Sequence, residues 1–243
     1  MKLGIKIYRI SDRDMSKIIE QTKPDFIETM AIEGEDYSGL KEFGLPVTIH
    51  CQHTMFGVNL ANPLIEDRNR KAVGFAIKTA DMLEAGTIVI HPGYMDNHSC
   101  GYEQLLSFLK SAYDPRIAIE NMPNTMNIGK DVMNLGHEPK DIMNIISETG
   151  VGFCLDIPHA VAAAAGTEKY YKDILREFLS IKPTCFHLSG TVVGQTVDKH
   201  LHLDEGDLDI GMVKKMLPKD AWVTLEVPTD TEGMARDIAI MRS

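Results

Sequence analysis

The stretch VGFCLDIPHA (residues 151–160) shows the pattern that decides the fold. An apolar run ends at Asp156, and a turn with Pro158 and His159 follows at once. A short continuous apolar run is typical of a strand that is buried on both faces. A carboxylate at the end of such a strand is costly to bury unless it is paired or bound to a metal ion. The stretch therefore predicts a buried strand that delivers ligands to a site.

The same pattern recurs in four other runs, which are TIVIHPG (87–93), RIAIENMP (116–123), PTCFHLSG (183–190) and WVTLEVP (222–228). Three more strands are predicted at 2–8, 25–30 and 46–50. Helical periodicity lies between the strands, at 12–23, 66–84, 101–112, 138–149, 167–181, 208–217 and 231–241. A less regular helical pattern covers 31–45, and AVAAAAG (160–166) indicates a tightly packed helix start. Gly86 and Gly150 are expected to end the helices before them.

Eight strands that alternate with helices indicate an α/β protein, and specifically a (β/α)8 TIM barrel. An open, doubly wound sheet is the alternative. The count of eight, and the absence of a G-x-G-x-x-G sequence after any strand, favour the barrel. No low-complexity linker divides the chain, so a single domain is predicted over residues 1–243.

Nine residues that can bind metal ions lie at or just after the ends of the predicted strands. They are His53, His91, Glu120, Asp156, His159, His187, Asp198, His200 and Glu226. Barrel active sites lie where the strands end, so these side chains are expected to converge. Their imidazole and carboxylate ligands suit Zn²⁺, Mn²⁺, Fe²⁺ or Co²⁺. Asp198 and His200 are expected to face one way in an extended segment, because residues i and i+2 of a strand share a face.

Several motifs together resemble the endonuclease IV branch of the xylose-isomerase-like barrels. They are HTMFGVNLANP (53–63), HPG (91–93), IEN (119–121), LDIPHA (155–160), FHLSG (186–190), VDKHLHLDEG (197–206) and LEVP (225–228). The resemblance runs from about residue 46 to 228, with the motifs in the family's order.

The resemblance implies three metal sites, with up to three Zn²⁺ ions; Mn²⁺ or another divalent ion is an alternative. His53, His91 and Glu120 would hold the first ion. The second would lie among Glu120, as a bridging ligand, Asp156, His187 and Glu226. His159, Asp198 and His200 would hold the third. His50 competes with His53 for the first site, and the six-residue spacing from His53 to Asn59 favours His53.

The function that the resemblance implies is metal-dependent phosphodiester hydrolysis, with cleavage of DNA at abasic sites. Three divalent ions would leave the centre positive, which suits a phosphodiester. A single ion at Glu120, Asp156, His187 and Glu226 would leave it negative, which suits a neutral sugar better. The alternative is therefore a mononuclear sugar or sugar-phosphate isomerase or epimerase. There Glu120 and Glu226 would be catalytic and would move a proton beside a polarised carbonyl. A non-catalytic protein that binds metal or a sugar phosphate is the third hypothesis.

Composition limits the partners. The formal net charge is −10, which argues against a general nucleic-acid or anionic-membrane surface. The segment 31–44 is short and acidic, and the cations available for phosphates are scattered: Lys130, Lys199, Arg68, Arg70 and Lys71. Abasic DNA, a phosphorylated sugar or a small carbohydrate remain as candidate partners.

No apolar run has the roughly 20 residues of a membrane span. No signal peptide is evident, and the four cysteines show no paired spacing, so a reducing cytoplasm is expected.

Some polar residues that are not among the nine candidate ligands could also contribute to the site. Glu28 could reach the site or only line the barrel, and Asn121 could orient Glu120 or contact substrate. His202 is expected to point away from the ligands, while Glu205 and Asp207 are expected to support the loop or the ligands around them. Cys154 and Cys185 lie inside apolar runs and are expected to be buried.

Overall fold

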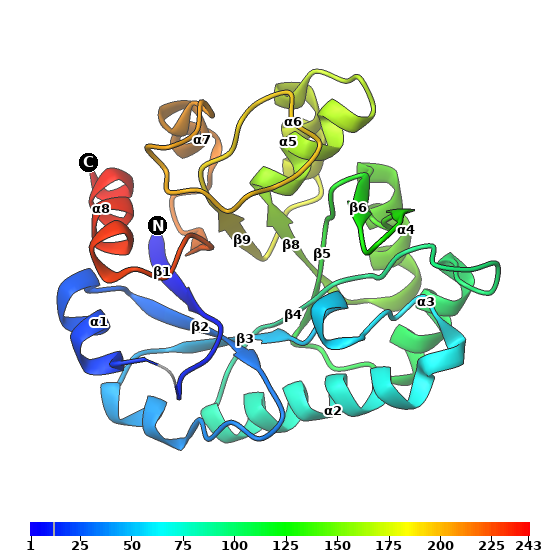
Figure 1. The fold of residues 1–243 in the computed structure, drawn as a ribbon, viewed down its shortest axis with the longest axis horizontal. Coiled ribbons are helices and arrows are strands. Elements are labelled where there is room, and N and C mark those ends of the chain that lie inside the picture. Colours follow the sequence, from blue (N-terminus) through cyan, green and yellow to red (C-terminus); the bar gives the residue numbers. More distant parts are fainter. Residues whose placement is uncertain (12) are drawn as a thin grey trace.

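Eight parallel strands form a closed barrel, and the helices form a ring around it (Figure 1). The computed structural model describes residues 1–11 and 13–243. In order around the barrel, the strands are β1 (Lys2–Ile7), β2 (Phe26–Ala31), β3 (Val47–Cys51), β4 (Ile88–Ile90), β5 (Ile117–Glu120), β8 (Gly152–Asp156), β9 (Cys185–Leu188) and β10 (Trp222–Leu225). Strand β10 pairs in parallel with β1 and closes the barrel. The predicted TIM barrel is therefore confirmed.

The predicted helices are present, with ends that shift by a few residues. They are α1 (Met15–Thr22), α2 (Glu66–Leu83), α3 (Tyr102–Ser111), α4 (Pro139–Thr149), α5 (Ile157–Gly166), α6 (Tyr171–Ser180), α7 (Ile210–Met216) and α8 (Thr231–Arg242). The helix predicted at 12–23 begins at Met15, and residue 12 lies outside the described residues. Short 3₁₀ helices occur at η1 (Ser38–Phe43), η2 (Thr54–Phe56) and η3 (Pro63–Ile65), so 31–45 contains no α-helix. No helix in the described part of the chain is long and apolar enough to cross a membrane.

The two predicted helix ends differ in outcome. Gly150 ends α4 in the left-handed conformation, with φ +76°, as expected. The prediction for α2 is wrong, because Glu84 and not Gly86 takes the left-handed position, with φ +55°. The Glu84 N–H then reaches the carbonyl groups of Ala80 and Asp81, which satisfies the last turn without a glycine.

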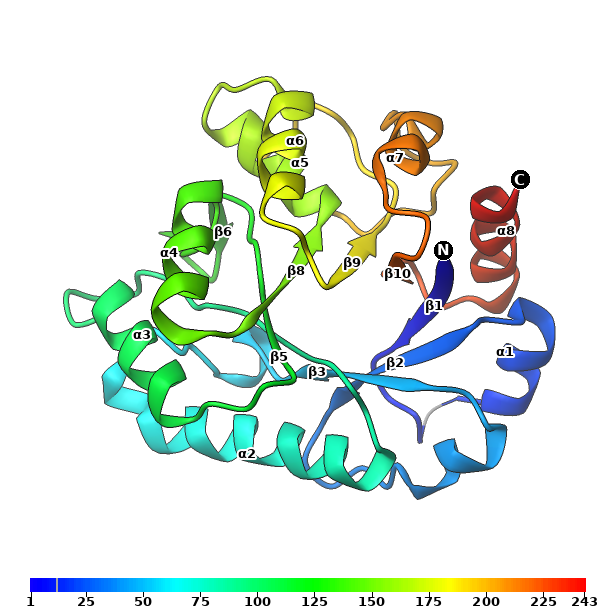
Figure 2. The ribbon, with the colours of Figure 1, turned by 180° about the vertical axis from the view of Figure 1, so that it is seen from behind.

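One element was not predicted, a hairpin of β6 (Thr125–Asn127) and β7 (Asp131–Met133). It follows β5 and lies beside α4 when the molecule is seen from behind (Figure 2). Each strand has three residues and exposes most of its side chains, so no hydrophobic alternation marks it in the sequence. Gly129, with φ +92°, allows the tight turn between the strands.

The interior of the barrel explains how the strands position ligands. Val89, Ala118, Cys154 and Cys185 form a small apolar cluster inside the barrel, separate from the larger core under the helices. Residues i and i+2 of a strand share a face, so the next inward positions are His91, Glu120, Asp156 and His187. The small residues fill the barrel below, and the ligands converge above them. The predicted burial of Cys154 and Cys185 is confirmed.

Candidate metal centre

Eight of the nine predicted ligands, together with His50, form three groups at the carboxyl end of the barrel. The first group is His50, His91 and Glu120; the central group is Glu120, Asp156, His187 and Glu226; the outer group is His159, Asp198 and His200. Within each group, the ligand atoms all lie within 4.8 Å of one another. Glu120 belongs to both the first and the central group, so these two share a carboxylate.

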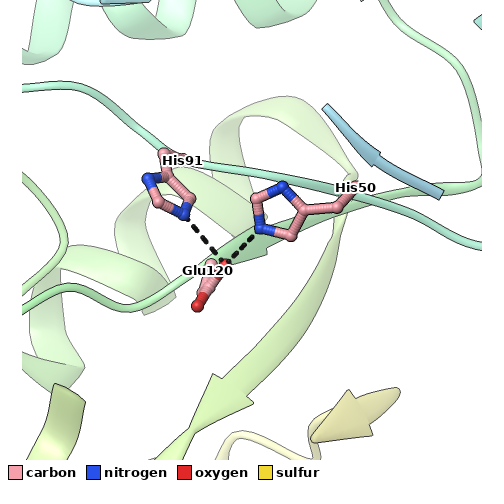
Figure 3. A group of neighbouring side chains, drawn as sticks. All are labelled: His50, His91 and Glu120. Atoms are coloured by element: carbon pink, nitrogen blue, oxygen red, sulfur yellow. Dashed lines mark hydrogen bonds and ion pairs between the residues drawn. The ribbon is translucent and has the colours of Figure 1, made fainter. Parts of the chain in front are cut away.

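The first group points two imidazole rings at one carboxylate (Figure 3). His50 Nε2 lies 3.2 Å and His91 Nε2 lies 3.3 Å from Glu120 Oε2. His50 lies two residues after the inward-facing Thr48 on β3, so the strand's alternation turns its ring into the barrel.

His53 lies beside the first group and not within it. It follows the end of β3, and its ring stacks on that of His91 with the ring centroids 4.7 Å apart. Its ring is 5.8 Å from that of His50. The structure therefore brings His50 into the position for which the motif spacing favoured His53. His53 lines the cavity above the centre and stays a predicted ligand.

The central group is the most buried part of the site, and each of its four residues is at least 94% buried. His187 Nδ1 lies 3.1 Å from Glu226 Oε2, 3.3 Å from Glu120 Oε1 and 3.9 Å from Asp156 Oδ2. All four residues lie at the ends of strands β5, β8, β9 and β10 or directly after them. Folding of the barrel alone therefore places three carboxylates around one imidazole nitrogen.

The outer group is assembled from a helix start and a loop. His159 lies in the first turn of α5, where Asp156 accepts a hydrogen bond from the His159 N–H. Asp198 Oδ2 lies 3.4 Å from His200 Nδ1 and 3.8 Å from His159 Nε2. The expectation of an extended Asp198–His200 segment is wrong, because His200 has a left-handed φ of +48°. The Asp198 carboxylate accepts a hydrogen bond from the His200 N–H and stabilises this turn.

The hydrogen bonds of three histidines fit metal binding. His50 Nδ1 donates to the Cys51 carbonyl at 2.8 Å, and His159 Nδ1 donates to the Asn121 carbonyl at 3.0 Å. A carbonyl can only accept, so in the neutral form that binds a metal ion each of these two rings would have its lone pair at Nε2, which faces a carboxylate. His187 is held by Glu28 at Nε2, which leaves Nδ1 toward the central group. Metal-binding histidines typically donate their other N–H in this way, so the residues fit divalent ions.

The electric field of the centre fits cations as well. Burial lowers the pKa of His159, but Asp156, Glu120 and Asp198 outweigh burial and raise it to about 10. Burial, with Glu120 and Asp198, raises the pKa of Asp156 to about 7. Asp198 Oδ2 is buried and accepts no hydrogen bond from the described residues. A buried cluster of carboxylates that lacks enough hydrogen-bond donors requires positive charge nearby.

A second layer of charged residues lies beneath the central group, and only Glu28 of this layer was considered from the sequence. Lys6 Nζ lies 2.7 Å from Glu226 Oε2 and 3.6 Å from Glu28 Oε1, and all three side chains are buried. Glu28 accepts hydrogen bonds from Thr224 and Thr48 as well as from His187. Glu28 therefore both lines the barrel and orients a ligand. A lysine in the otherwise apolar run 3–7 was the available signal for Lys6.

Two asparagines hold the ligands in place. Asn121 forms two hydrogen bonds with the backbone of Asp156, at 2.8 and 2.9 Å, so it orients Asp156 and not Glu120. Asn59 forms two hydrogen bonds with the backbone of Tyr94, at 2.9 and 3.0 Å, and thereby fixes the loop that follows His91.

His202, Glu205 and Asp207 support the outer loop. His202 is buried between Asp230 and Asp237, away from the three groups, as expected. Glu205 accepts a hydrogen bond from the His202 N–H, and Asp207 accepts one from the Val193 N–H. These contacts hold the segment that carries Asp198 and His200 against α8.

Three proteins illustrate what the chain is similar to. A protein of Aquifex aeolicus (strain VF5) named "Probable endonuclease 4" is 26% identical over 242 residues, which covers 92% of this chain and 81% of that protein. Endonuclease IV from Thermus thermophilus superposes with a TM-score of 0.76 at 19% identity, covering 100% of this chain and 98% of that one. A D-tagatose 3-epimerase-like protein superposes with a TM-score of 0.79 at 20% identity, covering 100% and 96%.

The two structural likenesses establish the fold, and they include proteins named for different chemistries. A sequence model for the family described as "Xylose isomerase-like TIM barrel" matches residues 38–243, which is most of the chain. That range contains all nine predicted ligands. The chain therefore belongs to the family of xylose isomerase-like TIM barrels.

Proposed function

We propose that this protein is a metal-dependent phosphodiester hydrolase with chemistry of the endonuclease IV type. The observation that carries this proposal is the presence of three ligand groups, two of them joined through Glu120, in one barrel mouth. A single-ion enzyme would need only one of these groups. The relative named "Probable endonuclease 4" adds support from sequence.

Each group would hold one divalent ion, with zinc as the first candidate because the ligands are imidazoles and carboxylates. His50 or His53 would complete the first group. When bound, such ions supply Lewis-acid activation of water and neutralise charge on the phosphate. Glu120 would fix the first and central groups relative to each other, since its two oxygens face different histidines.

The charge of the centre suits an anionic substrate. Glu120, Asp156, Asp198 and Glu226 carry four negative charges, and three divalent ions would carry six positive charges. Lys6 and Glu28 cancel each other and leave this balance unchanged. A net positive centre attracts a phosphodiester more strongly than a neutral sugar. Arg9, which is exposed and lines the cavity above the centre, adds a guanidinium suited to a phosphate oxygen.

The reaction is the addition of water across one P–O bond. The water oxygen forms a new bond to phosphorus, the bond to one ester oxygen breaks, and a proton from water ends on the leaving oxygen. Glu226 is held for this step by the Tyr8 hydroxyl at Oε1, 2.8 Å away, and by Lys6 at Oε2. These contacts keep the carboxylate oriented toward the ligand groups.

The proposal is tested with zinc-loaded protein on a duplex oligonucleotide with one abasic site and on a small chromogenic phosphodiester. Hydrolysis of either substrate that stops with a chelator and returns with zinc supports it. Failure to hydrolyse both substrates, by folded protein with a measured metal content, would contradict it.

A mononuclear sugar or sugar-phosphate isomerase or epimerase is the second candidate. One observation favours it. Among the ligand groups that the described residues form, only the central group has four ligands that are all buried. Glu120 and Glu226 would then be the catalytic pair that moves a proton beside a polarised carbonyl. Interconversion of ketoses or their phosphates by manganese-loaded protein, without phosphodiester hydrolysis, would select this function.

A further inference from the structure

Two cavities open from the metal centre in different directions, and they share His159 and His200. The first has a volume of about 450 Å³ and the second about 320 Å³. Both lie within the roughly 300–1,000 Å³ typical of sites that enclose a small molecule. A phosphate bound at the centre could therefore carry one ester group into each cavity.

The first cavity combines a cation with aromatic surface. Arg9 and Tyr8 line it on the side of β1, and Phe56 lines it on the side of η2. An arginine beside aromatic rings suits a flat group that carries negative charge or carbonyl oxygens.

The second cavity is mainly apolar. Met122 and Met126 line it on the side of the β6–β7 hairpin, and Val197 lines it from the loop before Asp198. Thr125, Asn127 and Asn134 also border it. The Asn134 amide already donates to the Pro123 carbonyl at 2.9 Å, and the Asn127 amide donates to the Asp131 carboxylate at 2.8 Å. Methionine side chains adapt to flat rings and form favourable contacts with them. An uncharged ring or apolar group fits this cavity best.

The hairpin that forms the second cavity is firmly attached to the barrel. Val132 is 95% buried, and the Met95 N–H donates to the Met133 carbonyl at 2.8 Å. The Leu135 N–H donates to the carbonyl of Gly93 at 3.0 Å. These contacts tie the hairpin to the loop after β4, next to His91. The hairpin is therefore a fixed wall of the site.

The cations that the sequence offers for phosphates are poorly suited to a long nucleic acid. Four of these five cations already form ion pairs: Lys130 with Asp96 at 2.9 Å, Arg68 and Lys71 with Glu33 at 3.3 and 3.2 Å, and Arg70 with Glu66 at 2.6 Å. Arg68 also donates to the Phe56 carbonyl, so it supports the η2 turn. Duplex DNA presents about one charge per 1.7 Å of axis and needs a set of free cations to neutralise it.

We infer that the substrate is a compact phosphodiester whose two ester groups occupy the two cavities, with an uncharged ring or apolar group on the hairpin side. The inference rests on the proposed hydrolase function and narrows its substrate class. The β6–β7 hairpin limits the size of the substrate, because its residues line the second cavity beside the outer group.

The test compares kcat/KM of zinc-loaded protein for a dinucleoside monophosphate and for a duplex with one abasic site. Met126→Trp fills the second cavity from the hairpin, and Val197→Trp fills it from the loop before Asp198. Ile128→Trp is the matched control, since Ile128 is exposed at the tip of the same hairpin and lines neither cavity. Thermal unfolding and zinc content are measured for each variant, and Val197→Trp serves alone if Met126→Trp does not fold.

We expect the dinucleoside monophosphate to be preferred over the duplex. Filling the cavity should lower kcat/KM for the dinucleoside monophosphate by about tenfold or more, with the control within about twofold of wild type. Equal or better cleavage of the duplex, or cavity variants that match the control, would overturn the inference while hydrolysis itself stands. Hydrolysis of neither substrate would refute the proposed function and the inference together.

Discussion

The central group and the outer group of the metal centre are built in different ways. The central group comes from strand ends, lies deep in the barrel and rests on a second layer of buried charges. The outer group comes from a helix turn and a loop with left-handed backbone, and the side chain of His200 is only partly buried. Strand pairing determines the first arrangement, whereas local loop contacts determine the second. We therefore expect the central group to withstand changes that abolish the outer one.

The largest effect is expected from Glu120→Gln, since this residue belongs to both the first and the central group. The variant should lose bound metal. Its rate of hydrolysis should fall by more than about 100-fold, which is the upper end of the range for mutating a residue that only supports a ligand. Metal analysis and phosphodiesterase assays measure both effects. Glu84→Gln, at the exposed end of α2, is the control and should match wild type. Wild-type turnover by Glu120→Gln would rule out a shared metal-binding role.

His200→Asn tests whether the outer group is separable. It removes one imidazole from the loop but leaves the strand-end ligands intact, so the protein should bind one metal ion fewer and keep the others. Native mass spectrometry of zinc-loaded variants gives the count. Loss of all metal would show that the outer group is needed to assemble the centre, and would contradict the independence of the central group.

Glu28→Gln sharpens the role of the layer beneath the central group. Glu28 accepts from His187 Nε2 at 3.1 Å, and the neutral amide holds that N–H less strongly. Losing such support typically lowers metal affinity by about 10–100-fold. Zinc titration against a competing chelator measures the change in affinity. An unchanged zinc affinity would mean that Glu28 only fills the barrel.

Gly93→Ala is expected to act through the loop after β4 and to have the smallest effect. Gly93 has φ +103°, and an added Cβ would lie 2.3 Å from Asn59 Oδ1 and 2.9 Å from Ala61 N. The strain of a non-glycine residue at this positive φ costs about 1–3 kcal/mol. At roughly 2–4 °C per kcal/mol for a chain of this size, calorimetry should show Tm lower by several degrees.

The control for this variant is Gly74→Ala, in the middle of α2 with nothing within 4 Å of the added Cβ. That variant should be stabilised by about 0.5–1 kcal/mol, because alanine favours a helix. Equal Tm values for the two variants would contradict the proposed strain at Gly93.

The barrel and its strand-end ligands could be predicted because both follow from simple periodicities. An apolar run that stops at a carboxylate or imidazole predicts the strand and the ligand together, and Glu120, Asp156 and His187 all lie in that pattern. His50 could have been placed from the same alternation, since it lies two residues after an inward-facing threonine. The motif spacing instead drew attention to His53, which lies outside the strand.

The surroundings of the site could not be predicted in the same way. The Lys6 contacts depend on pairing between β1 and β10, the first and last strands in sequence, and no local pattern reveals that neighbourhood. The β6–β7 hairpin has strands too short for a periodic signal. The left-handed turn at His200 depends on its hydrogen bond to Asp198, which overrides the extended conformation expected from the sequence.

The central claim, three metal ions in one barrel mouth, is tested most directly by metal content per chain. The protein is purified without chelator or affinity metal and analysed by mass spectrometry. The account predicts three ions, mostly zinc, one for each ligand group. A single ion, especially manganese, would contradict it and would direct the search toward sugar isomerisation.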